Sequence, residues 1–126
     1  MKILLVDDSG TMRKIQRNVL DSMGYKDVVE AEDGEQAIFR MKENNFQIDL
    51  ILCDWNMPKM DGITLVRKLS AVPNLARIPI LMVTTEGEKE KVVEALKAGA
   101  KGYVVKPFTP DQLKKRIEEI LQRQSN

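Results

Sequence analysis

The sequence predicts an α/β fold, a doubly wound (βα)5 arrangement in which helices cover both faces of a five-stranded parallel sheet. Three observations carry this prediction. Five short apolar runs alternate along the chain with segments of helical period. Several of the runs are apolar on consecutive residues, as expected for strands that are covered on both faces. The connections between runs and helical segments are short, so each run forms a βα unit with the segment that follows it.

The five expected strands are the runs 2–6, 28–31, 49–53, 78–83 and 102–106. Between them, apolar residues recur at helical spacing. The four groups are Met12, Ile15, Val19 and Met23; Ala37, Ile38 and Met41; Ile63, Val66 and Leu69; and Val92, Val93 and Leu96. Gly24 and Gly99 follow the first and last of these groups, and glycine is a typical helix stop.

The last helix has the clearest start signal. Thr109 is a candidate N-cap, Pro110 suits the first helical position, and Gln112 completes a capping box. The apolar stripe of this helix is Leu113, Ile117, Ile120 and Leu121. The helix uses nearly all the remaining residues, so we expect one domain over residues 1–126.

Composition excludes several classes of function. The chain has 126 residues, 20 basic and 19 acidic side chains and a net charge of +1, which argues against nucleic-acid or membrane-surface binding. With one cysteine and no histidine, it has no intrachain disulfide, no cysteine zinc site and no histidine base. No signal peptide or membrane-spanning run is present, so we expect a cytoplasmic protein, and a monomer.

Polar residues follow four of the five expected strands. Asp7 and Asp8 follow the first strand, Asp54 the third and Thr84 the fourth, while Lys106 ends the fifth. In open parallel sheets, ligands bind beyond the carboxyl ends of the strands, where the strand order reverses. With the order 2-1-3-4-5, which is borrowed from known sheets of this kind, the first and third strands flank that point. The three aspartates then converge in one crevice.

Three converging carboxylates repel one another, and a hard divalent cation removes the repulsion. Mg²⁺ prefers oxygen ligands and keeps several waters, so two carboxylates and a backbone carbonyl suffice to hold it. A phosphoryl group is a natural further ligand, with Lys106 neutralising one of its oxygens and the Thr84 hydroxyl donating to another. An aspartate is an established phosphoryl acceptor. The pattern therefore indicates phosphoryl transfer onto a carboxylate.

Each residue also has an ordinary structural interpretation. An aspartate after a strand is often a helix cap or turn residue, and a lysine is often solvated. We interpret Asp61, before Gly62, as turn chemistry and Cys53 as a small buried hydrophobe. Trp55 is expected at the rim of the site. The coincidence of the aspartates, the threonine and the lysine at strand ends favours a site over these separate explanations.

Other motifs do not fit. The segment 54–62 is no EF-hand loop, because Pro58 stands where a ligand belongs. No glycine-rich phosphate loop follows the first strand, which argues against a dinucleotide site. An aspartyl phosphatase of the haloacid dehalogenase type needs a second aspartate two residues after the nucleophile, and here that position is Asn56.

Four segments carry a family resemblance: VDDS (6–9), CDWNMPKMDG (53–62), VTTEG (83–87) and GYVVKPFTP (102–110). In this order and at this spacing they resemble a response-regulator receiver domain over essentially the whole chain. Within that family the chain is most similar to the single-domain chemotaxis regulators. The resemblance implies a flavodoxin-like fold with strand order 2-1-3-4-5.

The resemblance also implies a set of roles at the site. Asp54 would accept the phosphoryl group, and Asp8, Asp54 and the backbone carbonyl of Asn56 would ligate Mg²⁺, with Asp7 helping through water. The protein would be a phosphoacceptor switch and not an enzyme, apart from assisting its own phosphotransfer and a slow autodephosphorylation.

Further implied roles concern the other strand ends. Thr84 and Lys106 would contact the phosphoryl group, and Tyr103 would change rotamer as Thr84 moves. The Lys106–Pro107 bond is expected to be cis. Ser9 and Gly87 depart from residues common in chemotaxis members, so the lifetime of the phosphorylated state does not carry over.

The implied partners are a CheA-like histidine kinase as donor, a FliM-like flagellar motor switch protein as target, and a phosphatase. The implied output surface comprises the helix around residues 92–96, the last strand and the last helix, with Lys89, Tyr103, Lys115 and Arg116 on it. For Lys115 and Arg116, a solvated helix face is an equally good interpretation.

Alternatives to the motor-directed switch remain open at this point. A phosphorelay intermediate needs the same site and would present residues 11–20 to a histidine phosphotransfer protein. An aspartyl phosphatase for small molecules is disfavoured by Asn56. A domain cut from a larger regulator is a further alternative, although Met1 favours a natural start.

Overall fold

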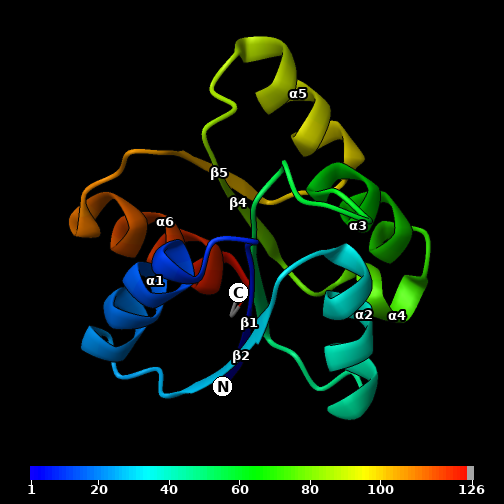
Figure 1. The fold of residues 1–126 in the computed structure, drawn as a ribbon, viewed down its shortest axis with the longest axis horizontal. Helices are drawn as coiled ribbons and strands as arrows, with labels where there is room; N and C mark the ends of the chain where they lie inside the picture. Colours follow the sequence, from blue (N-terminus) through cyan, green and yellow to red (C-terminus); the bar gives the residue numbers. More distant parts are fainter. Residues whose placement is uncertain (125–126) are drawn as a thin grey trace.

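The computed structural model describes residues 1–124, which form one five-stranded parallel sheet flanked by helices (Figure 1). The spatial order is β2-β1-β3-β4-β5, and each neighbouring pair of strands is parallel. The predicted fold class and strand order are confirmed. The strands are β1 Lys2–Val6, β2 Asp27–Ala31, β3 Leu50–Cys53, β4 Ile80–Thr84 and β5 Gly102–Val105.

Within the described residues, six helices connect and follow the strands. They are α1 Gly10–Ser22, α2 Gly34–Glu43, α3 Gly62–Ser70, α4 Pro73–Ala76, α5 Lys89–Ala98 and α6 Pro110–Gln124. In Figure 1, α1 and α6 lie on one face of the sheet, and α2 and α3 lie on the other with α5. None of these helices is long and apolar enough to cross a membrane.

Each face of the sheet has its own hydrophobic core. On one face, alternate strand residues such as Ile3 and Leu5 pack with residues of α1 and α6, including Leu20 and Leu113. On the other face, Leu4 and its equivalents in the neighbouring strands pack with α2, α3 and α5. This alternation explains why the runs are apolar on consecutive residues: successive side chains enter different cores.

Side-chain caps begin four of the described helices, α1, α2, α3 and α6. Ser9 accepts a hydrogen bond from the Met12 amide, and Asp61 accepts one from the Thr64 amide, so Asp61 has the turn role expected of it. Thr109 and Gln112 exchange side-chain-to-backbone hydrogen bonds in both directions, which confirms the capping box.

Strand register determines which residues meet at the carboxyl edge of the sheet. Val6 of β1 pairs with Cys53 of β3, so Asp7 and Asp54 are the next residues on two neighbouring strands. Thr84 of β4 pairs with Val105 of β5, which puts Lys106 one residue beyond Thr84. The fold thus gathers the polar strand ends along one edge.

The helices differ from the sequence prediction in three respects. The segment before β4 contains the extra helix α4, which begins with a proline at its first turn. In α1, Ile15 is exposed and the buried face is Gln16, Val19 and Leu20. The α5 residues Val93 and Leu96 are also exposed. Apolar period alone identifies a stripe, but it does not show whether that stripe faces the sheet or solvent.

Candidate functional site

Three carboxylates meet beyond the ends of β1 and β3. One oxygen from each of Asp7, Asp8 and Asp54 lies within 4.8 Å of the others. Asp7 and Asp54 are 1% and 9% exposed, whereas Asp8 is open to solvent. The predicted convergence of these aspartates is therefore confirmed, and the cluster has a buried base and an open side from which a ligand can enter.

Lys106 provides the positive charge within this cluster. Its Nζ lies 2.8 Å from Asp7 Oδ2 and 3.1 Å from Asp54 Oδ2. Burial acts to lower the pKa of Lys106, but the hydrogen bond to Asp7 and the charges of Asp54 and Asp7 outweigh it, so the pKa is raised. The lysine therefore stays charged at neutral pH. The Lys106–Pro107 peptide bond is cis, as the resemblance implies.

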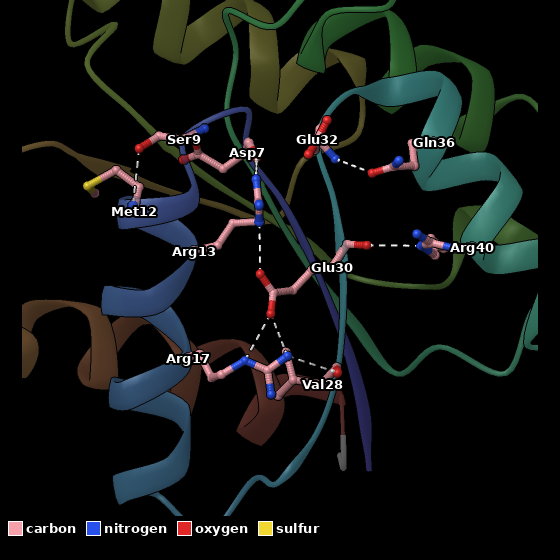
Figure 2. Close-up of polar contacts among 10 residues, drawn as sticks. All are labelled: Asp7, Ser9, Met12, Arg13, Arg17, Val28, Glu30, Glu32, Gln36 and Arg40. Atoms are coloured by element: carbon pink, nitrogen blue, oxygen red, sulfur yellow. Dashed lines mark hydrogen bonds and ion pairs between the residues drawn. The ribbon is translucent and has the colours of Figure 1, made fainter.

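Backbone contacts fix the loop that carries the acidic pair. The Asp7 amide donates to the Ala31 carbonyl of β2 at 3.0 Å, and the Ser9 amide donates to Asp7 Oδ1 at 2.9 Å. Arg13 Nη1 donates to the Asp7 carbonyl oxygen at 2.6 Å. Figure 2 shows Arg13 reaching from α1 across the top of β1. The backbone and the side chain of Asp7 are therefore both held.

Glu30 of β2 in turn holds Arg13. Its two carboxylate oxygens accept from Arg13 Nε at 2.8 Å and from Arg17 at 2.6 and 3.0 Å (Figure 2). Burial acts to raise the pKa of Glu30, but the two arginines outweigh it, and the pKa is lowered. Sequence reasoning missed this network. Its only signal was Arg13 and Arg17 one helical turn apart, and their shared partner lies on another element.

Hydrogen bonds to β1 and to the next residue hold Asp54. Its Oδ1 accepts from the Trp55 amide at 2.6 Å, and its own amide donates to the Val6 carbonyl at 2.9 Å. A Cβ on Gly62 would lie 2.0 Å from the Asp54 carbonyl oxygen, so only glycine fits there. Burial, followed by the charge of Asp54, raises the pKa of the Cys53 thiol, which agrees with the prediction of a buried hydrophobe and not a nucleophile.

Glu86 connects three of the predicted site residues, although the sequence analysis did not single it out. Its amide donates to Thr84 Oγ1 at 3.2 Å, its carbonyl accepts from the Tyr103 hydroxyl, and its carboxylate accepts from Asn56 Nδ2 at 2.7 Å. Thr84 is fully buried. Burial, with the charges of Glu86 and Asp54, raises the pKa of Tyr103 to about 12.

Trp55 does not lie at the rim where it was expected, because it is only 4% exposed and packs into the core beneath α5. The Lys91 ammonium of α5 lies 4.7 Å from the centroid of its ring, within the range of a cation–π contact. The indole is therefore a buried neighbour of Asp54, with a charged group from α5 above it.

The four residues predicted on the output surface lie on β5, α5 and α6. Tyr103, Lys115 and Arg116 line one hollow beside β5, and Tyr103 and Arg116 also line a second one with Leu96 of α5. Lys89 is separate from them and lines a shallow depression on α5. Arg116 also pairs with Glu119 at 3.2 Å, as expected of a solvated helix face.

The residues present fit a divalent cation of the magnesium type. The donors in the cluster are carboxylate oxygens, which Mg²⁺ prefers, and one of the carboxylates is open to solvent. Within the cluster, three carboxylates face a single ammonium group, so a divalent cation would balance the remaining charge.

Comparisons with known proteins agree on one family. The response regulator receiver domain matches residues 3–118. Chemotaxis protein CheY1 of Helicobacter pylori is 50% identical over 121 residues, which are 96% of this chain and 97% of that protein. Chemotaxis protein CheY of Pseudomonas aeruginosa is 47% identical over 98% of each chain. A crystal structure of the CheX-CheY-BeF3-Mg+2 complex from Borrelia burgdorferi matches with a TM-score of 0.89 and 30% identity, over 96% of this chain and 89% of that one.

Proposed function

This chain belongs to the response regulator receiver domain family, and on that premise we propose that it is a switch activated by phosphorylation of Asp54. Its similarity to CheY proteins makes it a chemotaxis response regulator of a two-component system. One observation gives the strongest support to phosphorylation at Asp54: this buried carboxylate lies beside two other carboxylates and the Lys106 ammonium at the open edge of the sheet.

The donor is a phosphohistidine of a CheA-like histidine kinase. A carboxylate oxygen of Asp54 attacks phosphorus, a new O–P bond forms and the N–P bond breaks. The bonding pair remains on the imidazole nitrogen, which then takes up a proton. Lys106, already 3.1 Å from Asp54, neutralises an oxygen of the transferred group, and the Thr84 hydroxyl donates to another.

Asp8, Asp54 and the Asn56 carbonyl would hold Mg²⁺, with Asp7 helping through water. When bound, the ion offsets the negative charge of the carboxylates and of the incoming phosphoryl group. Beyond its own phosphotransfer and slow autodephosphorylation, the protein has no catalytic role. Asn56 occupies the position where an aspartyl phosphatase carries its acid.

The output surface is that of α5, β5 and α6, with Lys89, Tyr103, Lys115 and Arg116 among its contact residues. Tyr103 connects the two regions, because its hydroxyl bonds to the Glu86 carbonyl while its side chain lines the hollows on this face. A FliM-like flagellar motor switch protein is the proposed target. A phosphatase is a further proposed partner, and the compartment is the cytoplasm, where the protein acts as a monomeric single domain.

Incubation with acetyl phosphate, followed by intact-mass measurement, tests the phosphoacceptor. We expect one Mg²⁺-dependent phosphoryl adduct in the native protein and in Asp61→Asn, since asparagine also caps a helix. We expect none in Asp54→Asn. Equal labelling of Asp54→Asn would overturn the assignment.

A second experiment separates the motor target from a relay. We expect beryllofluoride to increase affinity for a motor switch peptide. Unchanged affinity, combined with transfer from Asp54 to a histidine phosphotransfer protein faster than hydrolysis, would establish the relay instead.

A further inference from the structure

The N-terminus of α2 touches the loop between β3 and α3, although it does not belong to the acidic cluster. The Gly34 amide, at the first residue of α2, donates to the Met60 carbonyl oxygen at 2.9 Å. The Met60 side chain also packs over Gly34: a Cβ on Gly34 would lie 2.6 Å from Met60 Cγ and 2.8 Å from both its Cβ and Sδ. The two segments are therefore in direct backbone and side-chain contact.

Space, and not backbone conformation, explains the glycine at position 34. The positive-φ glycines among the described residues are Gly24 and Gly99, so Gly34 does not need the left-handed region. Alanine is favoured over glycine inside a helix. One of the three close atoms is Met60 Cβ, which a change of rotamer does not move. A methyl group at position 34 therefore has to displace the Met60 backbone.

The start of α2 is held in place by its cap and by buried residues. Asp33, itself only 6% exposed, caps the helix by accepting from the Gln36 amide at 2.8 Å. Ala37 and Met41 of α2 are fully buried in the core of that face. Met60 is only half-buried, and Pro58 and Lys59 before it are exposed. When atoms at the contact clash, the helix start is held by its cap and its core residues, so the loop is the part that moves.

The two ends of the loop are joined to each other. The Gly62 amide donates to the Trp55 carbonyl at 2.8 Å, and Asp61 caps α3. Between these two ends, Lys59 has a left-handed backbone with φ of 65°, and the Met60 amide donates to the Pro58 carbonyl at 2.7 Å. Met60 is therefore the point at which this tight turn rests on another helix.

We propose that Gly34 and Met60 form a clamp that positions the β3–α3 loop for Mg²⁺ binding. The inference rests on the proposed function, since the loop matters because it carries the Asn56 carbonyl. Gly34 and Met60 touch no ligand and act as positioning residues. Displacing Met60 moves the turn that follows Asn56, so the carbonyl no longer lies where the carboxylates require it.

Titration of Mg²⁺, followed by Trp55 fluorescence, tests the clamp. We expect Gly34→Ala to weaken Mg²⁺ binding about tenfold, a loss typical when groups that orient metal ligands are altered. Gly24→Ala is the matched control: it places the same methyl group on a glycine with φ of 90° and nothing within 4 Å of its Cβ. Urea unfolding without Mg²⁺ shows whether the two variants are comparably destabilised, and we expect Gly24→Ala to bind like the native protein.

Rescue distinguishes a clamp from general damage. With alanine at position 34, Met60→Ala removes two of the three clashing atoms and Met60→Gly removes all three. We therefore expect Mg²⁺ affinity to recover stepwise in the two double variants. With glycine at position 34, Met60→Gly is expected to weaken binding, because only packing is lost. The same substitution then has opposite effects in the two backgrounds.

Three results would overturn the clamp while leaving the proposed function intact: native-like binding by Gly34→Ala, an equal loss in Gly24→Ala, or no recovery in the double variants. If Gly34→Ala does not fold, Gly34→Ala with Met60→Gly is expected to fold and bind, and its failure counts against the clamp. Absence of Mg²⁺ binding in the native protein would instead refute the proposed function.

Discussion

Removal of the Lys106 charge should lower the stability of the metal-free protein and raise its affinity for Mg²⁺. We consider Lys106→Met, which keeps the unbranched chain as far as Cε and removes the ammonium group. Asp7, 1% exposed, loses a 2.8 Å partner, and Asp54 loses one at 3.1 Å. Loss of one partner from a buried ion pair costs about 3 kcal/mol or more in unfolding free energy.

The gain in metal affinity follows from Coulomb's law. At a separation of about 5 Å in water, a unit charge and a divalent cation repel by roughly 1.7 kcal/mol. Removal of the lysine charge should therefore tighten Mg²⁺ binding by about tenfold, which corresponds to about 1.4 kcal/mol. By linkage, saturating Mg²⁺ should narrow the stability gap between native protein and variant by a similar amount.

Urea unfolding of both proteins, with EDTA and with saturating Mg²⁺, measures the two effects together. The exposed Lys68→Met is the control and should change neither quantity. If the difference in unfolding free energy between native protein and Lys106→Met is the same with EDTA and with Mg²⁺, or if Lys106→Met binds Mg²⁺ more weakly, then Lys106 does not share the carboxylates with the ion.

Three further predictions concern neighbouring groups. Tyr103 has a folded pKa of about 12, above its ordinary 10, so the folded state retains this proton longer. Its contribution to stability should be complete below pH 10 and fall as pH rises towards 12, which unfolding of Tyr103→Phe and native protein across that range would test. The pKa of Glu30 is lowered, so its effect on stability depends on pH in the opposite direction. The difference in unfolding free energy between native protein and Glu30→Gln should be complete above pH 4.5 and shrink on acidification. A difference that does not change with pH would contradict the arginine network. Gly62→Ala, with its Cβ 2.0 Å from the Asp54 carbonyl, should cost about 1–3 kcal/mol in urea unfolding. It should also reduce labelling by acetyl phosphate, and native-like labelling would show that the loop relaxes freely.

Much of the fold was predictable because it depends on local chemistry and on strand period. The runs such as 2–6 are apolar on consecutive residues because alternate side chains enter two different cores. The Thr109 cap and the Asp61 turn depend on groups a few residues away. Convergence of Asp7, Asp8 and Asp54 followed once the strand order was supplied by the resemblance, since a parallel sheet brings its carboxyl ends to one edge.

The rest required coordinates, because it depends on contacts between distant segments. Arg13 meets Glu30 only because the fold brings the first turn of α1 beside β2, and Gly34 meets Met60 only because α2 begins beside the β3–α3 loop. Neither pair has a spacing signal. Likewise, helical period did not reveal that Val93 and Leu96 face outward, because α5 packs on the core through the small residue Ala95.

Trp55 fluorescence is the first measurement to make on phosphorylation of Asp54, because its indole is the only one in the chain and its amide bonds to Asp54 Oδ1. Native protein and Asp54→Asn are titrated first with Mg²⁺ and then with beryllofluoride. We expect a Mg²⁺-dependent change in the native protein and a second change with beryllofluoride that Asp54→Asn abolishes. A native protein that responds to neither would contradict this expectation, and the aspartates would then be a structural cluster in a phosphorylation-independent binding module.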